Sequence, residues 1–242
     1  MTGVIRSEVL RAVSAPTFLA ILALMIMVPA IILTSAGDLD GILALGSDGA
    51  TKRVFEPVAW AFVTAAFVGA NTVTREYYYH SIERSVVTAG FPRLFWAKAA
   101  AGSIVGLALG IVVSVIWLVV TFVVLSGDGI AMRLDAGIWA TAGGALAATV
   151  IGGTMGAAVG WIVRNYYIGA ALVLAVPIGL EYAMARAEMD VARFMPGMSL
   201  AALGGPTSRG EMLPFASGLG VAVAWAAVLL GIGYLLARRR FR

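Results

Sequence analysis

Apolar residues run in long, nearly uncharged windows along this chain, and most charged residues lie between the windows. A helix needs about 20 mostly apolar residues to cross the hydrocarbon core of a bilayer. The period-two alternation of a barrel strand is absent, so each window is predicted to be a transmembrane helix. The six windows cover approximately residues 17–36, 57–74, 97–125, 136–163, 166–184 and 215–237.

The positions of arginine and lysine predict the sidedness of these helices. Six spans place both termini on one side of the membrane. That side carries eleven basic residues, in the N-terminal segment, the second and fourth connections and the tail, whereas the other side carries six. By the positive-inside rule, both termini are predicted to be cytoplasmic.

Composition places the chain among integral membrane proteins. Of its 242 residues, 61% are apolar and 12% are charged, whereas a soluble domain has about 25% charged residues. The chain has no cysteine and one histidine, His80, which excludes disulfides, thiolate chemistry and multi-histidine metal sites. Abundant alanine, glycine and valine, with arginine preferred over lysine, indicate a GC-rich bacterial genome. We therefore expect a multi-pass protein of the bacterial cytoplasmic (inner) membrane.

The N-terminal segment, residues 1–16, fits two interpretations. Ile5, Val9, Ala12 and Val13 fall on one face of a helix, which predicts a helix lying in the cytoplasmic membrane interface. An ordinary polar lead-in to the first span fits the same residues. The first window also has the features of a signal peptide, because basic residues precede it and small residues end it.

The motifs of common enzymes are absent from the chain. Neither Lys52 nor Lys98 follows a glycine, so the phosphate-binding Gly-Lys-Ser/Thr motif is missing. There is no Gly-x-Ser-x-Gly pentad and no histidine pair of a metalloprotease. We therefore expect no enzyme activity, no cofactor and no metal on this chain. His80 has the chemistry of a pH sensor, although an exposed loop histidine is the simpler interpretation.

Glycine recurs every four residues in the third and fourth windows. Small residues at this spacing let helix backbones approach closely in lipid, where little hydrophobic force drives helices together. These glycines therefore predict helix-packing faces, either within one chain or between two chains. They are Gly102, Gly106, Gly110, Gly152, Gly156 and Gly160.

Ionisable residues are almost absent from the middle of the windows. Asn71 lies near the inner end of the second window and Glu181 near the outer end of the fifth, where facing the outer interface is the simpler role for Glu181. Carriers coupled to protons or sodium place ionisable groups near the midplane, and channels need a selectivity filter. The pattern favours a transporter that takes its energy from elsewhere and moves an apolar or amphipathic cargo.

The connection between the second and third windows, residues 75–96, is the one sizeable loop on the predicted cytoplasmic side. Tyr78, Ile82 and Val86 recur every four residues, which predicts a short helix with one apolar face, ending before Pro92. Such a helix could dock on a partner protein or rest on lipid headgroups. The periodicity alone does not distinguish these two possibilities.

This loop resembles that of the membrane subunits of type-2 ATP-binding-cassette (ABC) exporters. In that family the second span ends in a basic–acidic pair, and a short helix, a proline with nearby arginines and a lysine that opens the third span follow. His80-Ser81 stands where the family often has Gly-Thr. The matching residues are Arg75-Glu76, Ser81-Ile82, Pro92-Arg93 and Lys98.

The resemblance implies a permease subunit of an ABC transporter. Such a subunit pairs with a second permease, identical or different, and with two copies of a separate cytosolic ATPase that binds ATP and Mg. The loop would be the coupling helix that passes motion from the ATPase into the spans. Its coupling residues would be Arg75, Glu76, Tyr78, Tyr79, Ile82, Glu83 and Val86.

The resemblance also nominates a substrate path, because in the family the second and fifth spans line a pathway between paired permeases. The external segment 185–214 would correspond to short re-entrant helices over this path, with a disordered loop as the alternative. The substrate itself is not identified by the sequence, and a membrane scaffold or assembly protein is the alternative function. The residues nominated for the path are Trp60, Phe67, Asn71, Leu172, Val176 and Leu180.

Overall fold

The computed structural model describes residues 1–13, 17–35, 41–42, 44–205 and 212–241. Within these ranges every regular element is a helix and there is no strand, so the prediction of an all-helical chain is confirmed. Five helical segments are long and apolar enough to cross a membrane. They are Gly46–Tyr78, Phe91–Gly127, Ala136–Val163, Tyr166–Ala187 and Phe215–Arg240.

The first predicted span corresponds to α2, Thr17–Ser35, which contains Pro29. Within this helix, the apolar stretch Ala23–Ser35 is shorter than the five segments above. Ala36, the last residue of the predicted window, lies outside the described residues. The five long segments support a multi-pass membrane protein, and a sixth span remains a prediction.

The segment Gly46–Tyr78 forms the centre of the bundle. It consists of α4 (Gly46–Phe55), a 3-10 turn η1 (Glu56–Ala61) and α5 (Phe62–Tyr78), and 89% of its apolar window is buried. The helical segment therefore begins well before residue 57, the start of the predicted span. The sequence pattern did not predict α4 because Lys52 and Arg53 interrupt the apolar run, although Val54 and Phe55 are fully buried.

The long helix α7, Phe91–Gly127, also begins earlier than predicted, because residues 91–96 belong to the helix and not to the preceding loop. Pro92 lies in its first turn, where a missing N–H costs no hydrogen bond. Gly90, the residue immediately before α7, has φ +78°, a conformation that glycine adopts without strain. Pro92 thus follows the end of α6, as expected, and also lies in the first turn of α7.

The helix α8, Ala136–Val163, has the predicted bounds. The Asp135 side chain caps its first turn by accepting the backbone N–H of Ile138 at 2.9 Å. At the other end, Arg164 has φ +56°, and Asn165 then caps α9, Tyr166–Ala175. Two helices are thus joined by two residues, which makes them antiparallel neighbours.

The fifth predicted span is helical from Tyr166 but irregular in its C-terminal half. A π-helical turn, η2 (Val176–Glu181), follows α9 and continues into α10 (Tyr182–Ala187). Pro177 lies in the first turn of η2 and lacks an N–H, so the regular hydrogen-bond ladder cannot continue there.

Beyond α10, the described part of the segment 185–214 forms short helices: α11 (Met189–Ala192), α12 (Pro196–Ala201) and η3 (Ala202–Gly204). Pro206 lies outside the described residues. The core of α12 and η3 is buried against α13, Phe215–Arg240, and α8. Residues 196–204 therefore pack as part of the bundle.

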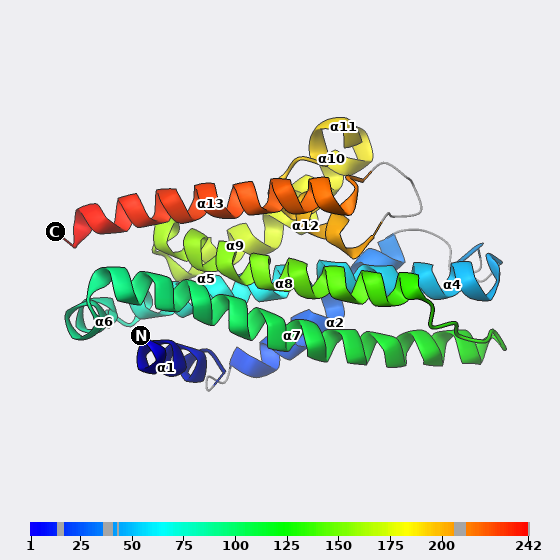
Figure 1. Ribbon diagram of the computed structural model, residues 1–242, viewed down its shortest axis with the longest axis horizontal. Helices are drawn as coiled ribbons and strands as arrows, with labels where there is room; N and C mark the ends of the chain where they lie inside the picture. Colours follow the sequence, from blue (N-terminus) through cyan, green and yellow to red (C-terminus); the bar gives the residue numbers. More distant parts are fainter. Residues whose placement is uncertain (14–16, 36–40, 43, 206–211, 242) are drawn as a thin grey trace.

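Both termini and the short helix α6, Ile82–Ala89, lie at the same end of the long axis of the molecule, whereas α4 lies at the opposite end (Figure 1). We call the first of these the terminal end. The N-terminal helix α1, Thr2–Val13, packs there on α7 and α5. Its buried face differs from the predicted apolar one, because Glu8 is buried and Val13 is 41% exposed.

Candidate functional site

A buried lysine joins three helices at the terminal end. Lys98, near the start of α7, is fully buried, and its Nζ donates to Glu8 Oε2 at 2.6 Å and Glu76 Oε1 at 2.9 Å. It also donates to the backbone carbonyl oxygen of Thr72 at 2.8 Å. An ammonium group has three N–H donors, so Lys98 is completely satisfied.

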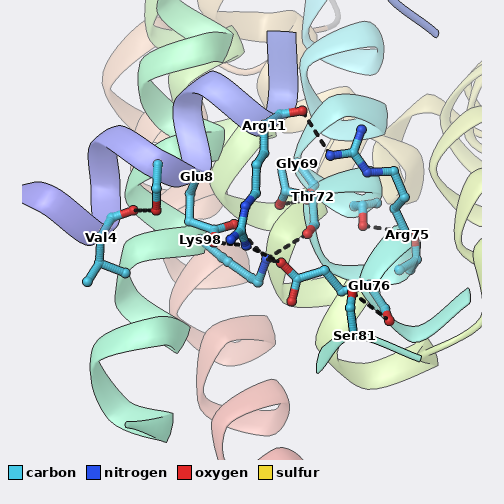
Figure 2. Close-up of polar contacts among 12 residues, drawn as sticks. Val4, Glu8, Arg11, Gly69, Thr72, Arg75, Glu76, Ser81 and Lys98 are labelled. Atoms are coloured by element: carbon cyan, nitrogen blue, oxygen red, sulfur yellow. Dashed lines mark hydrogen bonds and ion pairs between the residues drawn. The ribbon is translucent and has the colours of Figure 1, made fainter. Parts of the chain in front are cut away.

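Arg11 completes this cluster from the surface (Figure 2). One of its guanidinium nitrogens donates to Glu8 Oε1 at 3.1 Å and to Glu76 Oε1 at 3.0 Å. The neighbouring Arg75 donates to the carbonyl oxygen of Arg11 at 2.9 Å. We call Glu8, Arg11, Glu76 and Lys98 the Lys98 network. It fixes α1 to the end of α5 and the start of α7, because removing one member would leave a buried charge unpaired.

Sequence reasoning assigned Arg75 and Glu76 to this region but gave Glu8 no role and used Lys98 only for the family resemblance. The sequence does contain an indication that Lys98 is important, since a charged residue just inside an apolar window usually has a structural or functional role. The buried acceptors that pair with it come from residues 8 and 76. Periodicity cannot show which distant residues meet.

The short helix of the loop forms, but its apolar stripe is different from the predicted one. Tyr78 belongs to the end of α5, and His80 takes a left-handed conformation with φ +52° that separates it from α6. Tyr78, Ile82 and Val86 therefore do not share the face of one helix. Ile82 is 3% exposed and packs with Phe91 and other apolar residues of the chain itself.

The outward side of α6 carries different residues. Val87 is 86% exposed, and Glu83 on the same helix is exposed as well. Tyr79 is also exposed, and Tyr78 lies in ring contact with Tyr79, Tyr166 and Tyr167. The exposed surface of this region thus consists of one valine, a tyrosine cluster and charged residues.

A groove of about 750 Å³ lies between α1, α6 and the adjoining ends of α5 and α7. Three arginines line it, whereas its two glutamates are both paired within the Lys98 network. The second carboxylate oxygen of Glu76, Oε2, is buried and has no hydrogen-bond partner. Lining residues include Arg11, Arg75, Glu76, Tyr79, Arg84 and Thr88.

The residues nominated for a substrate path do not surround one cavity. Trp60, Phe67 and Asn71 are buried on the central segment, whereas Leu172 is 41% and Leu180 57% exposed. Trp60 lines a pocket of about 90 Å³, which we call the Trp60 pocket. Leu172 and Val176 line a separate pocket of about 230 Å³, which we call the membrane pocket.

The Trp60 pocket and the membrane pocket are neighbours that share a thin wall. Glu181 lines the membrane pocket, and the next residue, Tyr182, lines the Trp60 pocket. On α12, Gly197 likewise lines the membrane pocket, and the next residue, Met198, lines the Trp60 pocket. The carboxylate of Glu181 accepts the backbone N–H of Met198 at 3.0 Å, so η2 and α12 are joined within this wall.

The glycine stripes lie where helices of this one chain meet. A Cβ atom added at Gly102 would overlap the carbonyl oxygen of Gly153, and one at Gly156 would overlap that of Ala66. Gly106 and Gly110 approach Thr149 equally closely, and Gly152 and Gly160 approach α5. These glycines therefore pack α5, α7 and α8 together.

No group of three or more metal-ligating side chains occurs in the described ranges. Comparison of the sequence with models of protein families, and with curated proteins, finds no match.

Proposed function

We propose that this chain is the permease subunit of an ATP-driven exporter in a bacterial cytoplasmic membrane. In this proposal it pairs with a second permease subunit and with two copies of a separate ATPase, and it moves an apolar or amphipathic substrate. It has no ATPase activity of its own. The six-span topology with cytoplasmic termini belongs to the same proposal.

The observation that carries the proposal is the position of α6. This helix connects two long helices of the bundle, because α5 ends just before it and α7 begins just after it. Ile82 of α6 packs among buried aromatic residues of the bundle, whereas Val87 of α6 is exposed. A force applied to the outside of α6 would therefore reach both long helices.

The Lys98 network gives this connection a rigid support. Glu76 lies two residues before the end of α5, and Lys98 lies in the second turn of α7. Their ion pair, 2.9 Å long and buried, holds the two helix ends together beside α6. Movement of α6 would then displace α5, α7 and α1 as one unit.

The groove beside α6 suits a protein partner that carries acidic groups. Lys98 and Arg11 form ion pairs with Glu8 and Glu76, whereas Arg75 and Arg84 line the groove and have no carboxylate partner among the described residues. Interfaces enriched in tyrosine and arginine often contain the residues that dominate binding. Arg75, Arg84 and the tyrosine cluster around Tyr78 are such residues.

The test replaces the exposed valine, because an Ile82 substitution would disturb the core of the chain itself. Tagged wild type, Val87→Asp and Leu45→Asp are purified in mild detergent from the native membranes. Leu45 is the matched control, since it is an exposed apolar residue beside α4 at the opposite end. We expect ATPase activity to co-elute with wild type and Leu45→Asp and to be lost with Val87→Asp.

Two results would contradict the proposal. Wild type free of ATPase activity after gentle purification would favour the scaffold alternative. Undiminished ATPase co-elution with Val87→Asp, together with wild-type transport in vesicles, would show that α6 only rests on headgroups.

A further inference from the structure

The membrane pocket is almost entirely apolar. It lies between α5, α8, α9, η2, α12 and α13 and encloses about 230 Å³. For comparison, a cavity of about 150 Å³ can bind benzene, so this space fits a short alkyl chain or a two-ring system. Its lining includes Phe62, Val159, Leu172, Pro177, Trp225 and Leu229.

The pocket opens toward the position of the lipid between α9 and α13. Leu172 on α9 is 41% exposed and Trp225 on α13 is 37% exposed, and both line the pocket. The indole of Trp225 is held in place, because its N–H donates to the carbonyl oxygen of Phe194 at 2.9 Å. An amphiphile dissolved in the bilayer could therefore enter from the side.

One ionisable group, Glu181, lines this apolar space. It is 1% exposed and belongs to Tyr166–Ala187, one of the five helical segments that are apolar enough to cross a membrane. Buried carboxylates within such segments are costly, and they usually mark a functional site.

No lysine, arginine or histidine is among the described residues that line the membrane pocket. Glu181 accepts the backbone N–H groups of Met198 and Gly197, but an N–H group does not neutralise a carboxylate charge. The carboxylate also follows a π-helical turn, a distortion found frequently at functional sites. The pocket thus combines an apolar cavity, a lateral opening and a negative group without a cation.

We propose that the membrane pocket binds amphiphiles that carry an ammonium group, with the ammonium beside Glu181 and the apolar part against Val159, Leu172 and Leu229. The site is complete within one chain and does not depend on a second permease. That such amphiphiles are the transported substrates rests on the proposed function. The binding itself does not, and it can be tested on the purified chain alone.

The test uses three brominated probes of equal chain length: 8-bromooctylamine, 8-bromooctanoate and 8-bromooctanol. Bromine quenches tryptophan fluorescence at short range, and Trp225 lines the pocket. The full-length chain in discs of zwitterionic lipid is titrated with each probe. The component due to Trp225 is obtained by comparison with Trp225→Phe, since the chain has six tryptophans.

We expect saturable quenching of Trp225 by the amine, at a concentration about tenfold lower than for the carboxylate or the alcohol, which corresponds to about 1.4 kcal/mol. Glu181→Gln keeps an oxygen that can accept the Met198 N–H but removes the negative charge. This variant should bind the three probes with nearly equal midpoints. Val159→Phe should fill the pocket and abolish saturation, whereas Val223→Phe, on an exposed position of α13, should behave like wild type.

Equal midpoints for the three probes in wild type would overturn the proposal, because the carboxylate would then play no part. Quenching that is unchanged by Trp225→Phe or Val159→Phe would also overturn it, because the probe would be in bulk lipid. Amine binding without ATP-driven amine transport would instead show that these amphiphiles are not the transported substrates, and it would leave this binding site intact.

Discussion

Lys98 Nζ lies 2.6 Å from Glu8 Oε2, although 90 positions separate the two residues in the chain. Both side chains are buried, and Glu76 and Arg11 extend the contact to α5 and to the surface. A buried ion pair contributes little net stability compared with a well-packed apolar pair, but breaking it is costly. Its main effect is therefore to specify how α1 docks on the bundle.

The first prediction concerns this pair. Lys98→Met should destabilise the protein by about 3–5 kcal/mol, because Glu8 and Glu76 would remain buried without a cation. The triple variant Lys98→Met, Glu8→Gln, Glu76→Gln should recover much of the loss. Thermal unfolding in detergent, followed by circular dichroism, measures both effects.

The matched control is the only other lysine, Lys52, whose ion pairs with Asp48 and Asp135 are largely exposed. Exposed ion pairs contribute little to stability, so Lys52→Met should unfold close to the wild-type temperature. Equal unfolding temperatures for Lys98→Met and wild type would show that the buried network does not hold α1 in place.

The second prediction concerns the glycine contacts between helices. Gly156→Leu should sharply reduce the yield of folded, monodisperse protein, because a side chain there meets the backbone of α5 at Ala66. Gly231→Leu is the control, since no heavy atom lies within 4 Å of a Cβ at that position. Size-exclusion profiles of the two variants compare them directly, and similar profiles would contradict close packing at Gly156.

The third prediction concerns sidedness. The chain has no cysteine, so single cysteines can be introduced without background. Val87→Cys and Leu45→Cys are both exposed and lie at opposite ends. In intact cells an impermeant maleimide should label Leu45→Cys only, and permeabilised cells should show both. Labelling of Val87→Cys alone in intact cells would invert the topology.

The fourth prediction concerns pH and the cap of α8. The hydrogen bond from Lys52, together with the N–H of Ile138, lowers the pKa of Asp135 below its usual value near 3.8. A lowered carboxyl pKa stabilises the folded state above the pKa of the unfolded chain, and the stabilisation is lost as the pH falls through the lowered value.

Asp135→Ala should therefore lower the unfolding temperature at pH 7, and the difference from wild type should shrink as the pH falls below 4. Asp128→Ala, at an exposed position of the same loop, serves as the control. A difference that is the same at pH 7 and pH 3 would show that the charge of Asp135 is irrelevant and that only its packing matters.

The sequence by itself determined the elements that depend on local physics. Long apolar windows predict helices because backbone groups in lipid must be paired within the segment, and α8 has the predicted bounds. Glycine at four-residue spacing marks surfaces where backbones can approach, and Gly102 and Gly156 lie at such contacts. Helix ends were less predictable, since Pro92 is compatible with both the end of one helix and the start of the next.

Tertiary structure alone decided which residues meet. The polar residue Glu8 is buried because Lys98 reaches it from α7, and a helical period in residues 1–13 cannot show this. Ile82 faces its own core and Val87 faces outward because the chain turns at His80, which interrupts the four-residue repeat. Among the described residues that line the membrane pocket, Glu181 is the one ionisable side chain. This follows from the packing of five helices and the π-helical turn around the pocket, which the sequence does not show. Burial and charge pairing depend on contacts between distant segments, and those contacts follow from packing in three dimensions.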